Sequence, residues 1–374
     1  MAGGSERGVG LAQRHERFVI VIREVTSRDS AEVAGFLMET PIAAGTVFTF
    51  DRRPDFGALL RLRGTPRTFI AIIGSRIAGI VTAVWHDTMD GDVCGRVGEI
   101  ADLRVANWAR GGRIAFRLIQ AVHQAFDDAR VDWATCIIGD RNEDARGLVR
   151  GQAGLPSLQP LTQYVSVHFI AHRMRVPRPP PGIAIREAGA NDGELVNHVV
   201  EESTKGRQLV SHATLAWPDS HGSHRAWLAT DAHGRLIGGL VVWDGTGVRQ
   251  IRVSRYSKAD QTLRLLTIVA ARFRIVAPLP EPGGVLHVWS SRWFVVSSSN
   301  HRVGRALVAA ALRRAADEGC HVLQINLPRG DPLLSMLPFG ARATYGSTLY
   351  GCALRASSRP ASSSATYHAD VALV

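Results

Sequence analysis

The sequence predicts an α/β protein in which one unit of strands and helices occurs twice. Both halves begin alike: Ile22–Glu24 and Ile185–Glu187 read IRE, and each is followed by Asp and then Val at identical spacing. Both continue with two apolar runs joined by a Gly-containing turn, the pattern of a β-hairpin. Both then contain a strand, a long helix and a further strand. A tandem duplication explains this order more simply than one large α/β domain with chance similarity, which is the alternative.

The first half takes its elements from local signals. Asp29 follows the opening strand and is a residue type that caps helix N-termini. Between residues 111 and 129 apolar residues recur every four positions, which gives a helix one apolar face. The expected elements are a strand at 22–25, a helix after Asp29, a hairpin at 68–73 and 77–81, a strand at 98–105, a helix at 111–129 and a strand at 133–138.

The second half repeats this order. Gly319 follows a long helical segment and supplies the left-handed conformation that ends a helix. The expected elements are a strand at 185–188, a helix after Asp192, a hairpin at 226–230 and 236–240, a strand at 292–296, a helix at 301–318, a strand at 322–326 and a closing strand at 345–350.

The clearest boundary is the Pro-rich segment 176–182, because consecutive prolines cannot continue a helix or a central strand. We expect an N-terminal domain at 18–175 and a C-terminal domain at 183–354. Residues 1–17 are Gly-rich and charged without an apolar core, so they predict a disordered leader and no secretory signal. Residues 355–374 are rich in Ser and Ala and predict a flexible tail.

The composition argues against several classes of protein. The net charge is +11, but only two of the 44 basic residues are Lys and the arginines are spread along the chain. This distribution argues against a nucleic-acid partner, although positive charge suits a polyanionic cofactor. No run of about eighteen apolar residues occurs, so we expect no membrane span. The four cysteines lack CxxC spacing, which argues against zinc and disulfides and favours a cytoplasmic location.

The most informative stretch is a strand that leads through a basic, glycine-rich turn into the long helix of the first half. Backbone N–H groups at a helix start can bind an anion, and the helix dipole favours negative charge there. Gly111 and Gly112 let a phosphate approach the backbone, while Arg110 and Arg113 can neutralise its charge. The stretch predicts either a pyrophosphate cradle or an ordinary helix N-terminus with surface arginines.

This stretch resembles the GNAT superfamily of N-acetyltransferases, whose phosphate-binding loop reads Gln/Arg-x-x-Gly-x-Gly/Ala after a strand that often ends in Val. The chain has Arg110 first and Ala115 last, after Val105, and Arg113 replaces the central Gly. The family's Asn signature matches Asn142 after the following strand. The resemblance covers the order of elements across the first half and, more faintly, the second.

The resemblance implies two tandem GNAT-like domains, each a mixed, mostly antiparallel sheet flanked by helices. In the second half the loop runs from His301 to Ala306, and Gly304 and Ala306 stand in the family positions. His301 replaces the Gln or Arg, and no second Gly precedes the helix. We therefore expect the second half to be a degenerate copy that shapes the substrate cleft.

The resemblance also implies transfer of an acetyl group from acetyl-CoA, without a metal, to an amine of a small molecule or peptide by direct attack. The first domain is expected to bind acetyl-CoA. The residues expected to contact acetyl-CoA are Leu103, Val105, Arg110, Gly111, Gly112, Arg113, Ala115 and Asn142.

A carboxylate on the strand before the loop can accept the proton of the attacking amine. Asp102 and Glu99 are the candidates, and on a regular strand they face opposite sides unless a bulge intervenes. The alternative for Asp102 is a structural ion pair with Arg104 or Arg110. The family often uses a Tyr as general acid, and Val149 occupies the corresponding position, so the acid is unassigned.

Two other functions stay open. A non-catalytic CoA-binding or interaction protein is favoured by Arg113 and by the missing Tyr, and a nucleic-acid-associated protein is favoured only by the net charge. The segment Phe50–Phe56 combines acidic, basic and aromatic residues where GNAT proteins usually carry helices that contact substrate. Asp51 or Asp55 could bind a cationic amine there; the alternative is a solvated loop with an ion pair.

Overall fold

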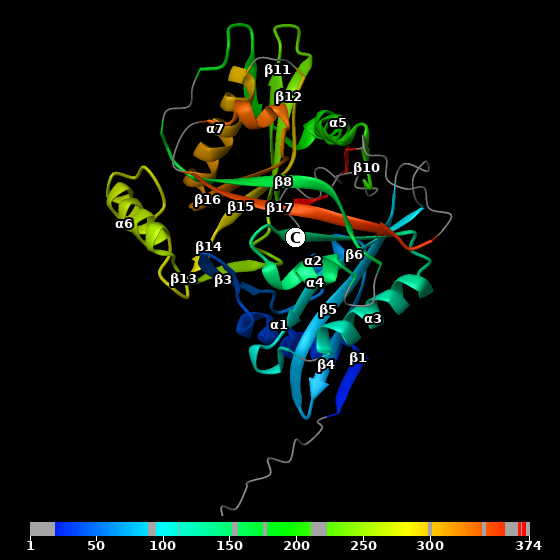
Figure 1. The fold of residues 1–374 in the computed structure, drawn as a ribbon. Coiled ribbons are helices and arrows are strands. Elements are labelled where there is room, and N and C mark those ends of the chain that lie inside the picture. The colour runs from blue at the N-terminus through cyan, green and yellow to red at the C-terminus, as the bar shows by residue number, and fades with distance from the viewer. Residues whose placement is uncertain are drawn as a thin grey trace, which may run out of the picture.

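The computed structural model describes residues 19–88, 95–111, 113–151, 156–174, 178–210, 223–297, 301–338, 342–355, 366–367 and 369–371. The predicted leader, Gly112, and the residues that follow the Asn signature at 152–155 lie outside these ranges. So do the first two residues of the Pro-rich segment. The described chain forms two lobes joined by long strands that cross between them (Figure 1).

The first half has the predicted elements together with a short insertion after the first helix. Its helices and strands are β1 (Ile20–Glu24), α1 (Ser30–Glu39), β2 (Ile42–Ala44), β3 (Thr46–Asp51), α2 (Ala58–Arg61), β4 (Thr65–Ile73), β5 (Arg76–Asp87), β6 (Arg96–Val105), α3 (Ile114–Asp128), β7 (Trp133–Gly139), α4 (Arg146–Val149) and β8 (Gln159–Ile170).

The second half repeats the order and carries its own insertion after the hairpin. Its helices and strands are β9 (Ala184–Glu187), α5 (Gly193–Thr204), β10 (Arg207–Gln208), β11 (His224–Thr230), β12 (Leu236–Asp244), β13 (Gln250–Arg255), α6 (Lys258–Arg272), β14 (Val285–Leu286), β15 (Val288–Val296), α7 (His301–Asp317), β16 (Val322–Pro328), β17 (Arg342–Ala353) and β18 (Thr366–Tyr367).

The two halves share one sheet of twelve strands in the order β1-β4-β5-β6-β7-β17-β8-β16-β15-β12-β11-β9. Counted inward from one edge, the first five strands are β1, β4, β5, β6 and β7, and counted inward from the other edge they are β9, β11, β12, β15 and β16. Corresponding strands of the two halves thus occupy corresponding positions in the sheet, which shows the duplication. At the centre the halves exchange strands: β17 pairs with β7, and β8 pairs with β16. In Figure 1 these two strands run across the middle of the molecule. The pairs β6–β7 and β15–β16 are parallel, and the other pairs are antiparallel.

A second, four-stranded sheet joins the insertions in the order β14-β13-β3-β2. Its central ladder pairs β3 of the first half with β13 of the second. The segment Phe50–Phe56 was expected either to bind a cationic amine or to form a solvated loop. Its first two residues instead form the end of β3, at the contact between the halves. Neither β13 nor α6 was among the predicted elements.

Each half buries both faces of its part of the large sheet. In the first half, α3 covers one face with residues such as Leu118 and Phe126, and α1 covers the other with Val33 and Leu37. Gly98 makes the packing of α3 possible, because a Cβ there would lie 2.5 Å from the ring of Phe126. In the second half, α7 and α5 take the corresponding places.

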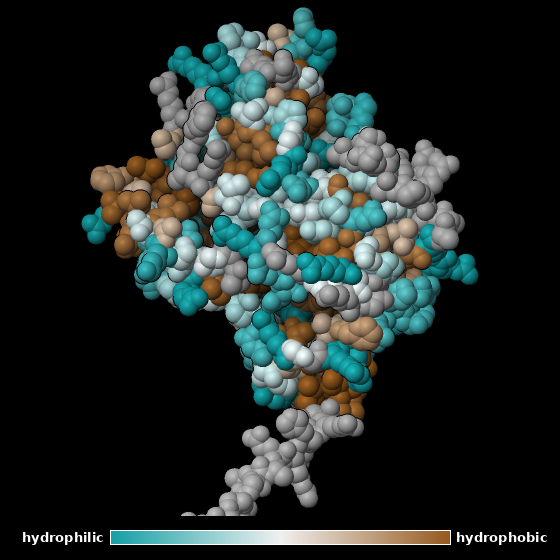
Figure 2. All heavy atoms as spheres, viewed as in Figure 1, coloured by the Kyte–Doolittle hydropathy of each residue, from teal (hydrophilic) through white to brown (hydrophobic). Residues whose placement is uncertain are grey.

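Helix α6 stands apart from these layers. It buries only Thr267 and leaves Leu265, Leu266, Val269 and, just beyond its end, Phe273 exposed to solvent. Figure 2 shows the resulting apolar patch at the side of the molecule where Figure 1 labels α6.

The last residues that the structure describes, within the segment predicted to be a flexible tail, pack against the rest of the chain. Tyr367 is 2% exposed, and its carbonyl oxygen accepts a hydrogen bond of 2.9 Å from the hydroxyl of Tyr164. The Nε of Arg292 donates to Asp370 over 2.7 Å. The Ser- and Ala-rich composition of the segment does not indicate these contacts, because only one buried Tyr and one ion pair hold the chain against the shared sheet.

Candidate active site

The parallel strands β6 and β7 lie side by side for only a short distance. Their ladder pairs Val97 with Trp133, Gly98 with Ala134 and Glu99 with Thr135, and it ends there. Beyond this point β6 continues to pair with β5, while β7 pairs with β17. Backbone N–H and C=O groups on the facing edges of the two strands are thereby released from the ladder, which creates a place for a ligand between them.

A bulge in β6 lies in the part of the strand that no longer pairs with β7. Ile80 of β5 pairs with Arg104 and Thr82 pairs with Ala101, so Asp102 and Leu103 together face the single residue Val81. Asp102 has φ +54°, a left-handed conformation that Asp tolerates better than most residues. An extra residue reverses the alternation of side chains along a strand. The bulge that would let both predicted carboxylates face the same side is therefore present.

Asp102 forms a buried ion pair. Arg52 donates to its two carboxylate oxygens over 2.6 and 2.9 Å, and the side chains of Arg52 and Asp102 are 4% and 7% exposed. Burial raises the pKa of Asp102, but the positive charges of Arg52, Arg104 and Arg63 outweigh burial, so the pKa lies below its ordinary value. The partner is thus Arg52, at the end of β3, and the sequence-based alternatives Arg104 and Arg110 do not form this pair.

Glu99 is held in a similar way. Arg63 donates from Nε to Oε2 over 3.1 Å, and a second contact joins its Nη2 to Oε1. The side chain of Glu99 is 18% exposed, against 6% for Arg63. The two carboxylates therefore each bind one arginine from the segment between β3 and β4, and Glu99 is the more accessible of the two.

Two further arginines complete this group. Arg104 donates to the carbonyl oxygen of Thr40 over 2.6 Å, and the guanidinium of Arg249 lies 5.7 Å from the centre of the Phe50 ring. Burial, together with the nearby charges of Arg52 and Arg63, lowers the pKa of Arg249 to about 9. We call the following residues the cleft cluster: Arg52, Arg63, Arg104, Arg249, Glu99 and Asp102.

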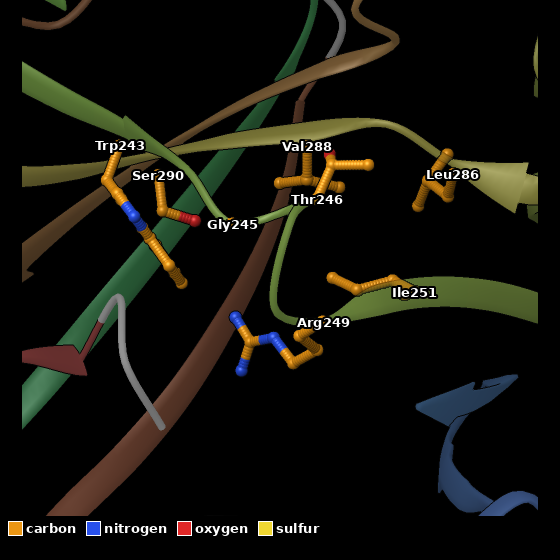
Figure 3. A pocket seen from close by; sticks show the side chains of 8 residues that line it. All are labelled: Trp243, Gly245, Thr246, Arg249, Ile251, Leu286, Val288 and Ser290. Atoms are coloured by element: carbon orange, nitrogen blue, oxygen red, sulfur yellow. The ribbon is translucent and has the colours of Figure 1, made fainter. Parts of the chain in front are cut away.

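The cleft cluster adjoins a small hollow in the second half. Arg249 lines it, and Figure 3 shows the Arg249 side chain extending below Trp243 and Ser290. Trp243 packs against Leu59 of α2, so the hollow lies where the halves meet. Sequence reasoning missed Arg52, Arg63 and Arg249, since only Phe50–Phe56 signalled a substrate contact and ion pairs between distant segments leave no local pattern.

The loop before α3 has the features of an anion site. Gly111 has φ +82°, a Cβ there would meet no atom within 4 Å, and Arg110 and Arg113 are exposed. Arg113 is the N-cap of α3, and no side chain of the described residues caps the helix there. Arg110 pairs with Asp144 over 3.1 Å, and both side chains are largely exposed. An exposed pair of this kind is weak, so Arg110 remains available to a ligand.

The other residues expected to contact acetyl-CoA surround the same place. Leu103 and Val105 lie on the part of β6 that no longer pairs with β7, and they pack partly against the core under α3. Ala115 is in the first turn of α3. Asn142 is exposed after the end of β7, and its N–H donates to the carbonyl of Gly139 over 2.9 Å. These residues thus lie on β6, at the start of α3 and after the end of β7, the elements that border the separation of the strands.

The corresponding separation in the second half is bridged by side chains. The ladder of β15 and β16 also covers three pairs, from Val288 with Val322 to Ser290 with Gln324. Beyond it, the backbone N–H of Asn326 donates to the hydroxyl of Ser291 over 2.9 Å, and the Asn326 amide donates to the Ser291 carbonyl over 3.2 Å. These bonds join the two strands where the first half leaves them apart.

Neither metal ligands nor membrane-spanning helices are found in the described part of the chain. No group of three or more His, Cys, Asp or Glu residues there could hold a metal ion. No helix there is long and apolar enough to cross a bilayer. Cys136 and Cys320 are buried in the core, and burial raises the pKa of each thiol to about 12, so neither is a thiolate at neutral pH.

Comparison with known proteins agrees with this architecture. The profile of the acetyltransferase (GNAT) family matches residues 34–152. A GCN5-related N-acetyltransferase from Sphaerobacter thermophilus superposes with a TM-score of 0.56 at 11% identity, covering 90% of this chain and 96% of the other. N-myristoyltransferase from Saccharomyces cerevisiae with bound myristoyl-CoA gives 0.57 at 11% identity, covering 93% and 84%.

A tandem GNAT protein from the clavulanic acid biosynthesis pathway superposes with a TM-score of 0.55 at 12% identity, covering 92% of this chain and all of the other. The comparison with curated protein sequences gave no match. The matched residues 34–152 contain the strand separation, the bulge and the loop before α3. Residues 34–152 therefore match the acetyltransferase (GNAT) family, and the chain as a whole has the fold of a tandem GNAT protein.

Proposed function

We propose that this protein is an N-acetyltransferase that moves the acetyl group of acetyl-CoA to an amine of a small molecule or peptide, without a metal. The observation that carries the proposal is the coincidence of three features in the first half. The start of α3, which no described side chain caps, the basic loop before it and the separation of β6 from β7 adjoin one another. We place this activity in the cytoplasm and assign residues 18–175 and 183–354 to two units joined at 176–182.

The loop suits the pyrophosphate of CoA because N–H groups at the start of α3, Arg110 and Arg113 would all face a polyanion. The unpaired edge of β6 at Leu103 and Val105 suits the thioester, whose carbonyl oxygen needs hydrogen-bond donors as charge develops on it. The bridge between Ser291 and Asn326 supports the assignment of CoA binding to the first half alone.

In the proposed reaction the amine nitrogen forms a bond to the thioester carbon, and the carbon–sulfur bond breaks. The proton lost by the nitrogen passes to a carboxylate, and the CoA sulfur leaves as a thiolate that regains a proton, so the products are an amide and free CoA. Asp102 and Glu99 are the proposed proton acceptors. Glu99 is favoured as the proton acceptor because its side chain is more exposed than that of Asp102. The lowered pKa of Asp102 also makes it the weaker base.

Calorimetry with acetyl-CoA tests the binding site. Arg110→Ala removes one charge-assisted contact and is expected to weaken binding about ten- to a hundredfold. The matched control is His301→Ala, the corresponding position of the second half, which should leave the affinity unchanged. A larger residue at Gly304 would not serve, because a Cβ there lies 2.9 Å from Met336. Loss of affinity in His301→Ala with none in Arg110→Ala would assign CoA to the other half.

The pH dependence of kcat/KM tests the proton acceptor. Glu99→Gln and Asp102→Asn keep the shape of each side chain but cannot accept a proton. The variant that removes the base should lose about 10²–10⁴ in rate, and the loss should shrink at high pH as free amine becomes plentiful. A variant with an unchanged pH profile identifies a carboxylate that only positions its arginine.

A non-catalytic CoA-binding protein is the second candidate function. It is favoured by the arginine partners of both carboxylates and by Arg113, which stands where the family has Gly. Acetyl-CoA that stabilises the protein in thermal unfolding, combined with no CoA release for any amine tested, would select this alternative.

A further inference from the structure

Helix α6 turns its apolar side toward water. The side chains of this side are between 56% and 72% exposed, and they are those of Leu265, Leu266, Val269 and, just beyond the helix, Phe273. Residues three or four apart are neighbours on a helix surface, so these positions share one side of α6, which we call the outer face. Helices of globular proteins normally bury their apolar side. The reversed arrangement, seen as the apolar patch in Figure 2, indicates that a partner covers it.

The inner side of α6 is held to the protein by polar contacts. The hydroxyl of Thr267 accepts a hydrogen bond of 3.1 Å from the N–H of Leu279. The Nε of Arg264 donates over 3.1 Å to a carbonyl of the same returning segment. Before the helix, the N–H of Ser257 donates to the hydroxyl of Thr46 over 2.9 Å. These bonds fix α6 on the insertion sheet, and the apolar residues of the outer face take no part in them.

Exposed cations stand at both ends of α6. They are Arg255, Lys258, Arg272 and Arg274. None of the four forms an ion pair within the part of the chain that the structure describes. The nearby acids are already engaged, because Asp260 accepts a hydrogen bond of 2.7 Å from Ser257 and Glu281 pairs with Arg264 over 3.2 Å. The outer face is therefore apolar with positive charge at its two ends, which is complementary to a negatively charged, partly apolar surface.

We propose that the outer face of α6 binds the surface of a membrane rich in anionic lipid, with the helix lying in the plane of the headgroups. The apolar side chains would enter the boundary between headgroups and acyl chains, and the cations would contact lipid phosphates. This mode of binding needs no membrane-spanning helix. It goes beyond the proposed acetyl transfer and does not depend on it.

The position and charge of α6 favour a membrane over a second copy of the chain. The helix lies at the side of the molecule, outside the layers of both lobes, where it can meet a flat surface (Figure 1). Both of its ends are cationic, so two copies packed through their outer faces, parallel or antiparallel, would bring like charges together.

Vesicle flotation of the full chain measures this binding without turnover. Vesicles of phosphatidylcholine alone are compared with vesicles that contain about 30% phosphatidylserine, the lipid that gives the cytoplasmic leaflet its negative potential. The wild type should bind the anionic vesicles at least about a hundredfold more tightly, because each cation near such a surface contributes about tenfold or slightly less. Added salt should weaken the binding by screening.

The apolar contribution is tested by Leu266→Gln combined with Phe273→Gln, which should lower the affinity for anionic vesicles at least about tenfold. The matched control is Val19→Gln combined with Val21→Gln, since both valines are exposed in the first half, away from α6. The control should bind as wild type does, and urea unfolding should show that both double variants are folded.

The charge contribution is tested by Lys258→Gln combined with Arg272→Gln, which should weaken binding about thirtyfold. The control Arg28→Gln combined with Arg313→Gln removes the same net charge from two exposed positions outside α6 and should bind as wild type does.

The outcomes separate the occupants of the outer face. A lack of binding to anionic vesicles would overturn the proposal, as would equal binding to neutral ones or binding that survives in Leu266→Gln with Phe273→Gln. A dimer in sedimentation velocity that this variant abolishes would assign the face to a second copy instead. Binding through α6 by a protein that acetylates no amine would leave this inference standing while the proposed enzyme function falls.

Discussion

The buried pair of Arg52 and Asp102 gives the sharpest prediction about stability. Asp102→Asn preserves the size of the side chain but removes its charge. Arg52, 4% exposed, is then left buried without the carboxylate that it binds at 2.6 and 2.9 Å. Breaking a buried pair from one side typically costs about 3–5 kcal/mol, since an uncompensated charge remains. We expect the free energy of unfolding to fall by about that amount.

Urea unfolding followed by tryptophan fluorescence measures this loss, and a double variant identifies its cause. Arg52→Met combined with Asp102→Asn removes the stranded charge, so it should recover much of the stability lost in Asp102→Asn. The control Glu202→Gln breaks an exposed pair with Lys205 and should cost less than about 1 kcal/mol. A double variant no more stable than Asp102→Asn would show that the stranded arginine is not the cause.

The same pair fixes the sign of an acid dependence. The folded pKa of Asp102 lies below its unfolded value, which is about 3.9. Its contribution to stability is therefore complete above that value and is lost as the pH falls through the folded pKa. Asp102→Asn should lose this acid-labile part and unfold with a flatter dependence on pH below about 4. An Asp102→Asn protein as stable as wild type at neutral pH would refute the reasoning.

Three further predictions concern the loop and the core. Asp144→Asn frees Arg110 from an exposed pair and should leave acetyl-CoA binding unchanged or tighten it up to about fivefold in calorimetry. Gly98→Ala forces a methyl group against Phe126 and should lower the free energy of unfolding, measured in urea, by about 1–3 kcal/mol. As a control, the methyl group of Gly35→Ala in α1 meets no atom within 4 Å and should raise the free energy of unfolding by about 0.5–1 kcal/mol. Burial lowers the pKa of His168 to about 4. Between pH 6.5 and pH 4 the unfolded state therefore binds a proton that the folded state does not, and the free energy of unfolding falls as the pH is lowered through this range. His168→Gln should make this decrease smaller.

The elements and their repetition follow from patterns that are local in the sequence. Apolar residues every four positions in α3 and the Gly-containing turns of both hairpins are such patterns, and sterics and burial act on them directly. The order of the strands in the sheet preserves that repetition. The candidate loop at Arg110 to Ala115 could be found for the same reason, because a basic, glycine-rich helix start is contiguous in the chain.

The surroundings of the candidate bases depend instead on contacts between distant segments. Arg52 meets Asp102 across fifty positions of sequence, and Arg249 joins them from the other half of the chain. The exchange of β8 and β17 likewise depends on pairing between distant strands. No local pattern encodes such contacts, because they arise only when burial of both lobes brings remote segments together. The local patterns of the sequence thus specified the elements of each half, whereas the folding of one half against the other brought these charged side chains together.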